Sequence, residues 1–521
     1  MRRRYGLGRF PVPVCIGLLL CCGCGPSRDV HVEQGVLRGT RGSHGSVLVF
    51  KGVPYAAPPV GDLRWQPPRP PKPWKGVRAA GAFAPGCVQK PVRSLLPWTE
   101  EFMHQGETGE DCLYLNIWTG ARAEGARRPV MVFLHGGAFT GGSGSVAVYD
   151  GEALARKGVV VAVPNYRVGP AGFLAHPELT RESDHRASGN YGLLDQAAAL
   201  WWIHNNIAAF GGDPDRVTIF GQSAGAVSAA LLAESPLADG LFARVVLQSG
   251  PGLFPPGGPG GAAPLEEAER EGERFARALG APTLAALRAL PAEALLDIPP
   301  EIRFGPVRDN WFVPPEPLGA GRADVLIGST ADDLGFGGSG ATVREYEAAA
   351  RRQFGDRAGL FLGLYPAASD AAVPAAEKDS GRDRARVSIH LWAAGQAAAG
   401  ADVYTYCFDR AIPWPEHPEF GAFHSGELPY VFSNLRLLDR PWEDADRTLA
   451  EQMSSYWVRF AATGDPNGEG LPPWPRFDAS LAATMRLGAD PGAVAVAAPE
   501  KLSFWKEALA GAGQQESAGG D

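Results

Sequence analysis

The sequence predicts an α/β protein built on a large, mostly parallel central sheet with helices on both faces. Three observations support this fold class. Short β-branched runs recur along the chain, longer stretches with helical spacing separate them, and the composition is globular, with 45% hydrophobic and 20% charged residues. Strands that alternate with helices are typical of parallel sheets, because each crossover lays a helix on one face of the sheet.

Six runs rich in β-branched residues and leucine are short enough to be buried strands. They span residues 130–134, 159–163, 217–220, 245–247, 325–327 and 403–408. Between the second and third runs, Tyr191–Asn206 carries apolar side chains near helical spacing and predicts a helix. We expect one α/β domain over 25–510, because no linker or internal repeat divides it, with Pro251–Ala263 as a surface loop.

The first 24 residues predict a secretory signal peptide. Three arginines at positions 2–4 precede an apolar run around 14–20, which is too short to cross about 30 Å of hydrocarbon. Gly23 and Cys24 also fit a bacterial lipoprotein cleavage site, although Cys21 stands where such sites usually have an aliphatic residue. We therefore expect an exported protein that is secreted, periplasmic or anchored by a lipid on Cys24.

Charge and composition exclude several classes of partner. With 49 basic and 57 acidic residues, the formal net charge is −8, so no positive excess is available to bind nucleic acid. After the predicted signal peptide the chain has no CxxC or HExxH motif that could offer a metal site, and we expect neither a metal nor a cofactor. No later stretch is apolar enough to span a membrane, and 511–521 is expected to be a disordered tail.

Three cysteines remain after the signal peptide. Because an exported protein meets an oxidising compartment, Cys87 and Cys112, the two nearest in sequence, are predicted to form a disulfide. Cys407 lies in the alternating run 403–408 and is expected to be a buried thiol.

The chemistry centres on Gly221-Gln222-Ser223-Ala224-Gly225, the one G-x-S-x-G in the chain. The predicted strand 217–220 ends directly before it, and the stretch 226–233 predicts a helix directly after it. A strand, a tight turn and a helix make a nucleophile elbow, in which the turn lifts the serine oxygen above the sheet. Ser223 is therefore the candidate nucleophile.

A serine hydroxyl needs a base, and in this fold an acid and then a histidine follow the serine along the chain. Three histidines follow Ser223. His390 lies in a helical stretch and His417 lies between prolines, whereas His424 lies in a loop well after the run 403–408, where the fold places its base. His424 is the best candidate.

The residue pattern leaves the acid open between two neighbours. Asp332 and Asp333 both follow the strand 325–327, and either could hold the imidazole tautomer while the other caps a helix. The segment His135–Phe139 follows the strand 130–134, where backbone N–H groups can bind an oxyanion, and Ala224 supplies another N–H.

With these residues in place, the sequence resembles the type-B carboxylesterase family, α/β-hydrolases that include the cholinesterases. The resemblance covers nearly the whole chain after the signal peptide. The segments that carry it, in order, are FKGVPYAAPPVGDLRW, EDCLYLNIW, HGGAF, NYRVG, GNYGLLDQAAALWWIHNNIAAFGGDPDRVTIFGQSAG, VVLQSG, GAFHSGELPYVF, YWVRFAATGDPN and WPRF.

The resemblance implies a role for individual residues. The nucleophile falls on Ser223, the base on His424 and the acid on Asp333. The remaining roles fall on Gly137, Ala138 and Ala224 as oxyanion donors, on Cys87 with Cys112 as a disulfide, on Arg64 with Glu110 and Arg167 with Asp195 as structural ion pairs, and on Ser249 behind the triad.

The sequence also departs from the family pattern. Asp333 stands where a glutamate is common and Leu334 replaces the glycine after it, which makes the acid the least secure assignment. Gln222 replaces the glutamate that usually precedes the nucleophile, so a choline-ester specialist is disfavoured. Ala138 replaces the third glycine of HGGG and slightly narrows the oxyanion hole.

We expect a serine hydrolase that cleaves small-molecule carboxylic esters through an acyl-enzyme. Two alternatives from other classes stay open. One is a non-catalytic adhesion or scaffold protein of the same family, and the other is a dinucleotide-binding oxidoreductase, suggested by the glycine-rich stretch 142–147.

Overall fold

The computed structural model describes residues 28–121, 125–253, 261–315, 323–333 and 340–518. The predicted signal peptide and Cys24 lie outside these ranges, as does most of the predicted loop 251–263. None of the described helices is long and apolar enough to cross a membrane.

An eleven-stranded sheet forms the centre of the described structure, in the order β18-β17-β16-β15-β12-β11-β9-β10-β8-β4-β3. The six neighbouring pairs from β17 to β10 are parallel, and the pairs nearer the two ends are antiparallel. The strands are β3 (Thr40–Arg41), β4 (Leu48–Pro54), β8 (Tyr114–Thr119), β9 (Arg128–Leu134), β10 (Val160–Pro164), β11 (Gly212–Gln222), β12 (Arg244–Gln248), β15 (Asp324–Thr330), β16 (Val403–Phe408), β17 (Ala483–Leu487) and β18 (Gly492–Ala495).

All six strands predicted from the sequence are present, as β9, β10, β11, β12, β15 and β16, and they occupy six neighbouring positions in the sheet. The predicted α/β class is therefore confirmed. Antiparallel strands at both ends, such as β4 and β18, extend the sheet beyond the part that the sequence predicts.

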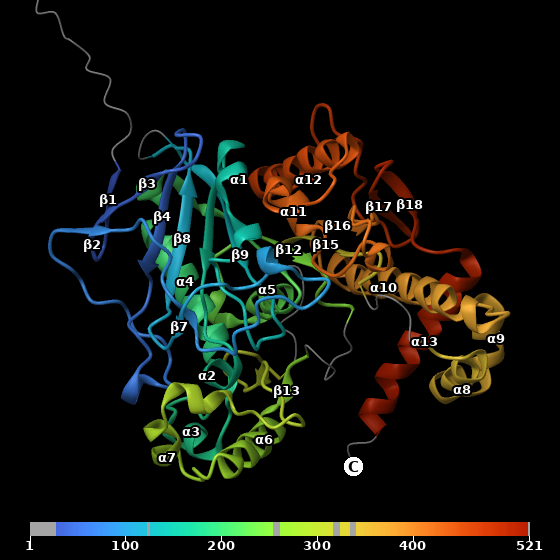
Figure 1. The fold of residues 1–521 in the computed structure, drawn as a ribbon, viewed down its shortest axis with the longest axis horizontal. Helices are drawn as coiled ribbons and strands as arrows, with labels where there is room; N and C mark the ends of the chain where they lie inside the picture. The colour runs from blue at the N-terminus through green and yellow to red at the C-terminus, as the bar shows by residue number, and fades with distance from the viewer. Residues whose placement is uncertain (1–27, 122–124, 254–260, 316–322, 334–339, 519–521) are drawn as a thin grey trace, which may run out of the picture.

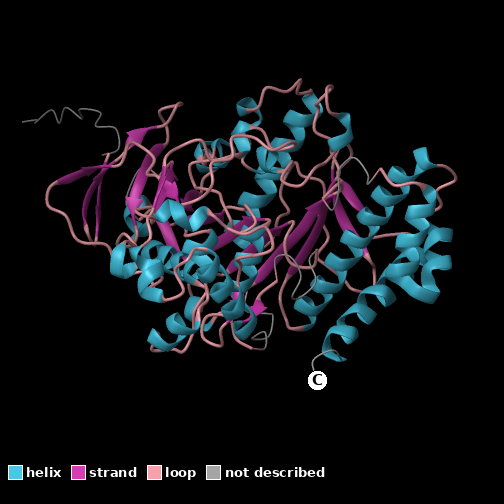
Figure 2. Ribbon diagram, turned by 60° about the horizontal axis from the view of Figure 1, so that its bottom comes forward, coloured by secondary structure: helices cyan, strands magenta, loops and turns pink. Residues whose placement is uncertain are grey.

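Helices lie on both faces of the sheet (Figure 2). The helices are α1 (Glu152–Arg156), α2 (Gly169–Phe173), α3 (Pro177–Glu182), α4 (Tyr191–Asn206), α5 (Ala224–Glu234), α6 (Leu265–Ala278), α7 (Leu284–Ala289), α8 (Val343–Phe354), α9 (Ala358–Leu364), α10 (Val373–Ala398), α11 (Leu428–Val431), α12 (Asp444–Thr463) and α13 (Pro499–Ala518). The predicted helix 191–206 is α4, with the same bounds. The structure continues α13 to Ala518, into the segment 511–521 for which the sequence predicts a disordered tail.

Strand β9 shows why the predicted runs are continuous and apolar. Val130, Val132 and Leu134 belong to the apolar core on one face of the sheet, and Met131 and Phe133 belong to the core on the other. Successive strand side chains point to opposite faces, so a strand that is covered on both sides contains no polar alternation.

Smaller elements complete the fold. Helices α8, α9 and α13 gather beside α10 at one end of the molecule (Figure 1), where Tyr346, Phe361 and Trp505 share a separate apolar cluster. Short strands form three small sheets, which are β1 (Asp29–Val32), β2 (Gly35–Arg38) and β5 (Val77–Ala79), then β6 (Gly86–Cys87) with β7 (Thr108–Gly109), and β13 (Ala263–Pro264) with β14 (Val307–Arg308).

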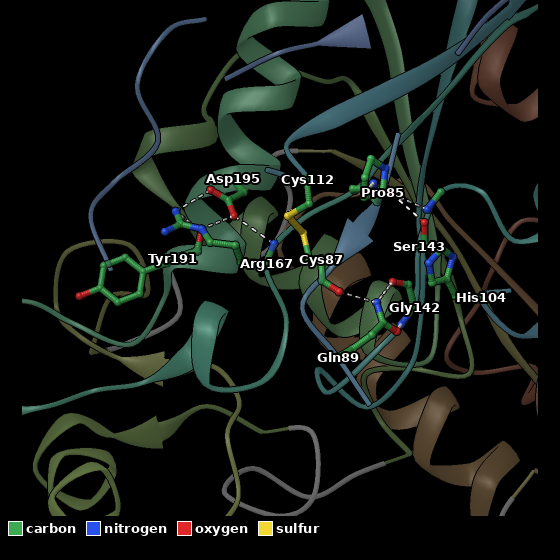
Figure 3. The surroundings of a disulfide bond; sticks show 12 residues. Pro85, Cys87, Gln89, His104, Cys112, Gly142, Ser143, Arg167, Tyr191 and Asp195 are labelled. Carbon is green, nitrogen blue, oxygen red and sulfur yellow. Dashed lines mark hydrogen bonds and ion pairs between the residues drawn. A yellow bond between two sulfur atoms is a disulfide. The ribbon is translucent and has the colours of Figure 1, made fainter. Parts of the chain in front are cut away.

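The predicted disulfide joins Cys87 to Cys112, with the sulfurs 2.00 Å apart (Figure 3). Cys407 in β16 is a buried free thiol, as predicted, and burial raises its pKa to about 12. A thiol with that pKa is almost entirely protonated at neutral pH and is therefore a poor nucleophile.

The two ion pairs implied by the family resemblance are also present, one fully buried and one partly buried. Nε of Arg64 lies 2.7 Å from a carboxylate oxygen of Glu110. Arg167 forms a bidentate ion pair with Asp195, in which Nε and Nη2 each lie 2.7 Å from one carboxylate oxygen. Asp195 sits in α4 and also accepts a hydrogen bond from the backbone N–H of Arg167 at 3.0 Å (Figure 3). These contacts brace α4 against the segment after β10.

Candidate active site

Ser223 occupies the sharp turn between β11 and α5, as the sequence predicts. Its backbone has φ 57° and ψ −126°, which is an unfavourable conformation for a residue with a Cβ atom. The neighbouring structure holds this turn, because the Ser223 N–H donates to the Gln248 carbonyl at 2.9 Å and the Ser223 carbonyl accepts from Ala226 and Val227.

The two glycines of the motif are required by close approach of the backbone. A Cβ atom on Gly221 would lie 2.3 Å from the carbonyl oxygen of Gly225. A Cβ atom on Gly225 would lie 1.9 Å from the carbonyl oxygen of Leu134, at the end of β9. Glycine at these positions therefore lets α5 start directly against the sheet, with Ser223 at its first turn.

The structure brings His424 to Asp333. His424 lies in the loop before α11, and its Nδ1 is in hydrogen-bonding contact with Oδ1 of Asp333, which follows β15. The other oxygen of Asp333 accepts from the Thr330 N–H at 3.1 Å. Since a carboxylate can only accept here, Nδ1 carries the proton and Nε2 of the neutral ring carries a lone pair.

Asp332, the other candidate acid, has different partners. Its carboxylate pairs with Lys378 at 3.2 Å and with Arg382 at 2.8 Å, both from α10. Its Oδ2 accepts from the Ala422 N–H at 2.8 Å, two residues before His424. Asp332 therefore holds the histidine loop in position, and Asp333 contacts the imidazole.

Opposing effects act on the pKa of His424. Burial alone lowers it, but the charge of Asp333, the hydrogen bond to Asp333 and the charge of Glu427 outweigh burial and raise the pKa above its ordinary value. The His424 side chain is 15% exposed, so part of it stays accessible to solvent.

Nε2 of His424 makes a hydrogen bond with the residue before the nucleophile. Nε2 of Gln222 lies 3.0 Å from it. Among the described residues, the hydroxyl of Ser223 forms no hydrogen bond with a side chain, so the predicted contact between Ser223 and His424 stays a prediction.

The predicted oxyanion segment lies against the serine. A Cβ atom on Gly136 would be 3.0 Å from the Ser223 Cβ atom. Gly137 and Ala138 have φ values of 118° and 53°, and their N–H groups donate to no acceptor in the described residues. Ala224 is the first residue of α5, where a helix leaves its N–H groups unpaired.

Glu427 is a buried acid that the sequence analysis did not single out. Its two oxygens accept from Gln248 and Tyr406, each at 2.9 Å, and burial raises its pKa to about 7. The sequence signal that could have identified Glu427 is its position three residues after His424. Ser249, predicted to lie behind the triad, is fully buried at the end of β12, and its hydroxyl has no partner in the described residues.

The remaining sequence candidates lie elsewhere. His390 is buried in α10, where burial lowers its pKa, and His417 contacts Glu419. In the glycine-rich stretch 142–147, the N–H groups of Gly142 and Gly144 donate to side chains of the protein, so they are not free to bind a phosphate.

Comparison with known proteins identifies the relatives of this chain. The model of a family described as the carboxylesterase family matches residues 26–358 and 378–505. The chain is 40% identical over 477 residues to a fumonisin B1 esterase from Sphingopyxis macrogoltabida, which covers 86% of this chain and 84% of that protein. It is 34% identical over 525 residues to the human cocaine esterase, covering 93% and 91% of the two chains. It is 35% identical over 491 residues to a phenmedipham hydrolase from Pseudarthrobacter oxydans, covering 88% and 95%.

The close contact at Gly225 predicts that adding one methyl group there strongly destabilises the fold. In Gly225→Ala, the new Cβ atom meets the Leu134 carbonyl, so α5 or β9 must shift, and we expect the free energy of unfolding in urea to fall by about 3 kcal/mol or more. Gly381→Ala is the matched control, because Gly381 lies within α10 with open space around its Cβ position. That variant should gain about 0.5 to 1 kcal/mol. Equal effects of the two substitutions would contradict the account of the elbow.

Proposed function

Because the chain belongs to the carboxylesterase family and is a carboxylic ester hydrolase of the α/β-hydrolase fold, we propose that it works by acyl transfer to Ser223. In this proposal His424 is the base, Asp333 orients it, and the N–H groups of Gly137, Ala138 and Ala224 form the oxyanion hole. The observation that carries it is the contact between Nδ1 of His424 and Asp333 beside the serine turn.

The proposed reaction has two halves. His424 takes the proton of Ser223 as the serine oxygen attacks the ester carbonyl, and the backbone N–H groups stabilise the negative oxygen. The protonated imidazole then gives its proton to the departing alcohol, which leaves an acyl-enzyme. Water, deprotonated by His424, attacks this intermediate, and the imidazolium returns the proton to the Ser223 oxygen as the acid is released.

The relatives support ester hydrolysis without pointing to one compound. Their names refer to fumonisin B1, cocaine and phenmedipham, three different substances. We therefore propose a small-molecule ester as the substrate class. The alternative of a non-catalytic scaffold gains no support from these relatives, since each is named as a hydrolase or an esterase.

We also propose that the protein is exported. The basic and apolar segment 1–24 supports this proposal, and the Cys87–Cys112 disulfide fits an oxidising compartment. Cys24 is the proposed site of a lipid anchor.

Export can be checked by intact-mass analysis of the chain made with its full leader in a bacterium. Cleavage before Cys24 with a lipid mass on that cysteine is the expected result, and Cys24→Ala should remove the lipid. An unmodified cleaved chain would overturn the anchor alone. A chain that keeps residues 1–24 would overturn export.

Removing the nucleophile or the base should abolish turnover of a nitrophenyl ester. We expect Ser223→Ala and His424→Ala each to lower kcat by about 10⁴-fold or more without changing the unfolding transition. Because His424 must be neutral to act, kcat/KM of the unmodified enzyme should fall as pH drops through a pKa above the reference value of about 6.5. A profile that stays flat to pH 4, or substantial activity in either variant, contradicts the proposal.

Substitution of the two neighbouring acids, Asp333 and Asp332, should have clearly different effects on kcat. Asp333→Asn removes the charge that raises the pKa of His424 and the acceptor that fixes its tautomer, so kcat should fall by about 10³- to 10⁴-fold. Asp332→Asn is the control, because it loses ion pairs with Lys378 and Arg382 and should lower stability while keeping kcat within about tenfold. The reverse pattern of kcat values would assign the acid to Asp332.

A further inference from the structure

The contact between Gln222 and His424 has a chemical direction. Because Nδ1 of His424 donates its proton to Asp333, Nε2 of the neutral ring can only accept a hydrogen bond. The Gln222 atom 3.0 Å away is therefore the NH₂ group of the amide, which donates to the lone pair of Nε2. This lone pair is the one that must accept the proton of Ser223 in the proposed reaction.

We propose that Gln222 is a positioning residue of this hydrolase, whose amide holds Nε2 of His424 in the free enzyme and yields that atom to the Ser223 hydroxyl when an ester reacts. The inference rests on the proposed function, because it concerns the same base. It assigns a role to the variable residue of the G-x-S-x-G motif.

The surroundings keep the amide in place. Gln222 ends β11 and is 2% exposed. A Cβ atom on Gly136 would lie 3.1 Å from Oε1 of Gln222. The amide therefore occupies a narrow space that a larger residue at position 136 would reduce. Trp98 holds the histidine: it donates from Nε1 to the His424 carbonyl at 3.0 Å, and its ring lies edge-on to the imidazole.

The other charged groups around His424 act in the opposite sense. Asp333, from the segment after β15, and Glu427, from the start of α11, both favour the protonated imidazole. Tyr406 of β16 donates its hydroxyl proton to Glu427. An N–H donor on Nε2 stabilises the neutral imidazole instead, so Gln222 opposes the two acids and keeps the base ready at lower pH.

A carboxylate in the same place would behave differently. When ionised it could only accept, so it would bind the protonated imidazole and would add another negative charge near the ring to that of Asp333. The amide is thus suited to an enzyme whose histidine already faces two acids.

The test compares Gln222→Glu and Gln222→Met with the unmodified enzyme, using the pH dependence of kcat/KM for a nitrophenyl ester. Methionine cannot donate a hydrogen bond to Nε2 of His424, so the acid limb of the profile, where kcat/KM falls with decreasing pH, should move to higher pH by about 0.5 pH units or more. Glutamate should move it further, by about one unit or more. Titration of the His424 ring by NMR, assigned with His424→Ala, should show the same order without any turnover.

Gln89→Met is the matched control. Gln89 is also a buried glutamine, but its amide contacts the backbone of Cys87 and Gly142 instead of a histidine. Its acid limb and ring titration should equal those of the unmodified enzyme.

The outcomes distinguish this inference from the proposed function. The role of Gln222 is overturned if the pKa of His424 is unchanged, or is lower, in folded Gln222→Met and Gln222→Glu. The proposed mechanism still stands in that case, provided that Ser223→Ala is inactive. Full activity in Ser223→Ala overturns the mechanism itself. A shift in Gln89→Met as large as that in Gln222→Met would also overturn the inference, since the effect would not need contact with the ring.

Discussion

The hydrogen bond between His424 and Asp333 joins two loops that leave neighbouring strands of the sheet. Asp333 follows β15, and His424 lies in the long connection after β16. A second link runs beside it, because Asp332 and Phe423 form a β-bridge and Asp332 binds the Ala422 N–H. One acid therefore fixes the loop and the next one fixes the ring, so the imidazole is oriented before any substrate arrives. In the proposed mechanism, a base that is oriented in advance contributes to catalysis without further reorganisation.

The sequence was most informative where burial was complete. Strands such as β9 and β10 are apolar because helices cover both faces of the sheet, and they were predicted at nearly their observed positions. The strands towards the ends, β4 and β18 among them, were not predicted. Gly492–Ala495 is partly exposed and has no strong β-branched run, so its strand depends on pairing with β17. Such pairing is a tertiary effect that a local pattern does not encode.

The candidate site divides in the same way. The serine turn is local, since strand, glycines and helix adjoin in sequence, and the pattern located it. The choice between Asp332 and Asp333 is not local, because it depends on contacts with His424 and Ala422 about ninety residues away along the chain. Residue patterns left that choice open, and the family resemblance pointed to Asp333. The contacts of Gln222 with His424 and of Glu427 with Gln248 join residues still farther apart along the chain, and neither was anticipated.

The solitary thiol of β16 gives the molecule an internal reporter of unfolding. Cys407 is 5% exposed and is the one free cysteine in the described part of the chain. Because its side chain is largely buried and burial raises its pKa to about 12, the thiol should react slowly with an alkylating reagent while the sheet is intact. Its modification therefore measures how often the sheet opens around β16, the strand that precedes the histidine loop.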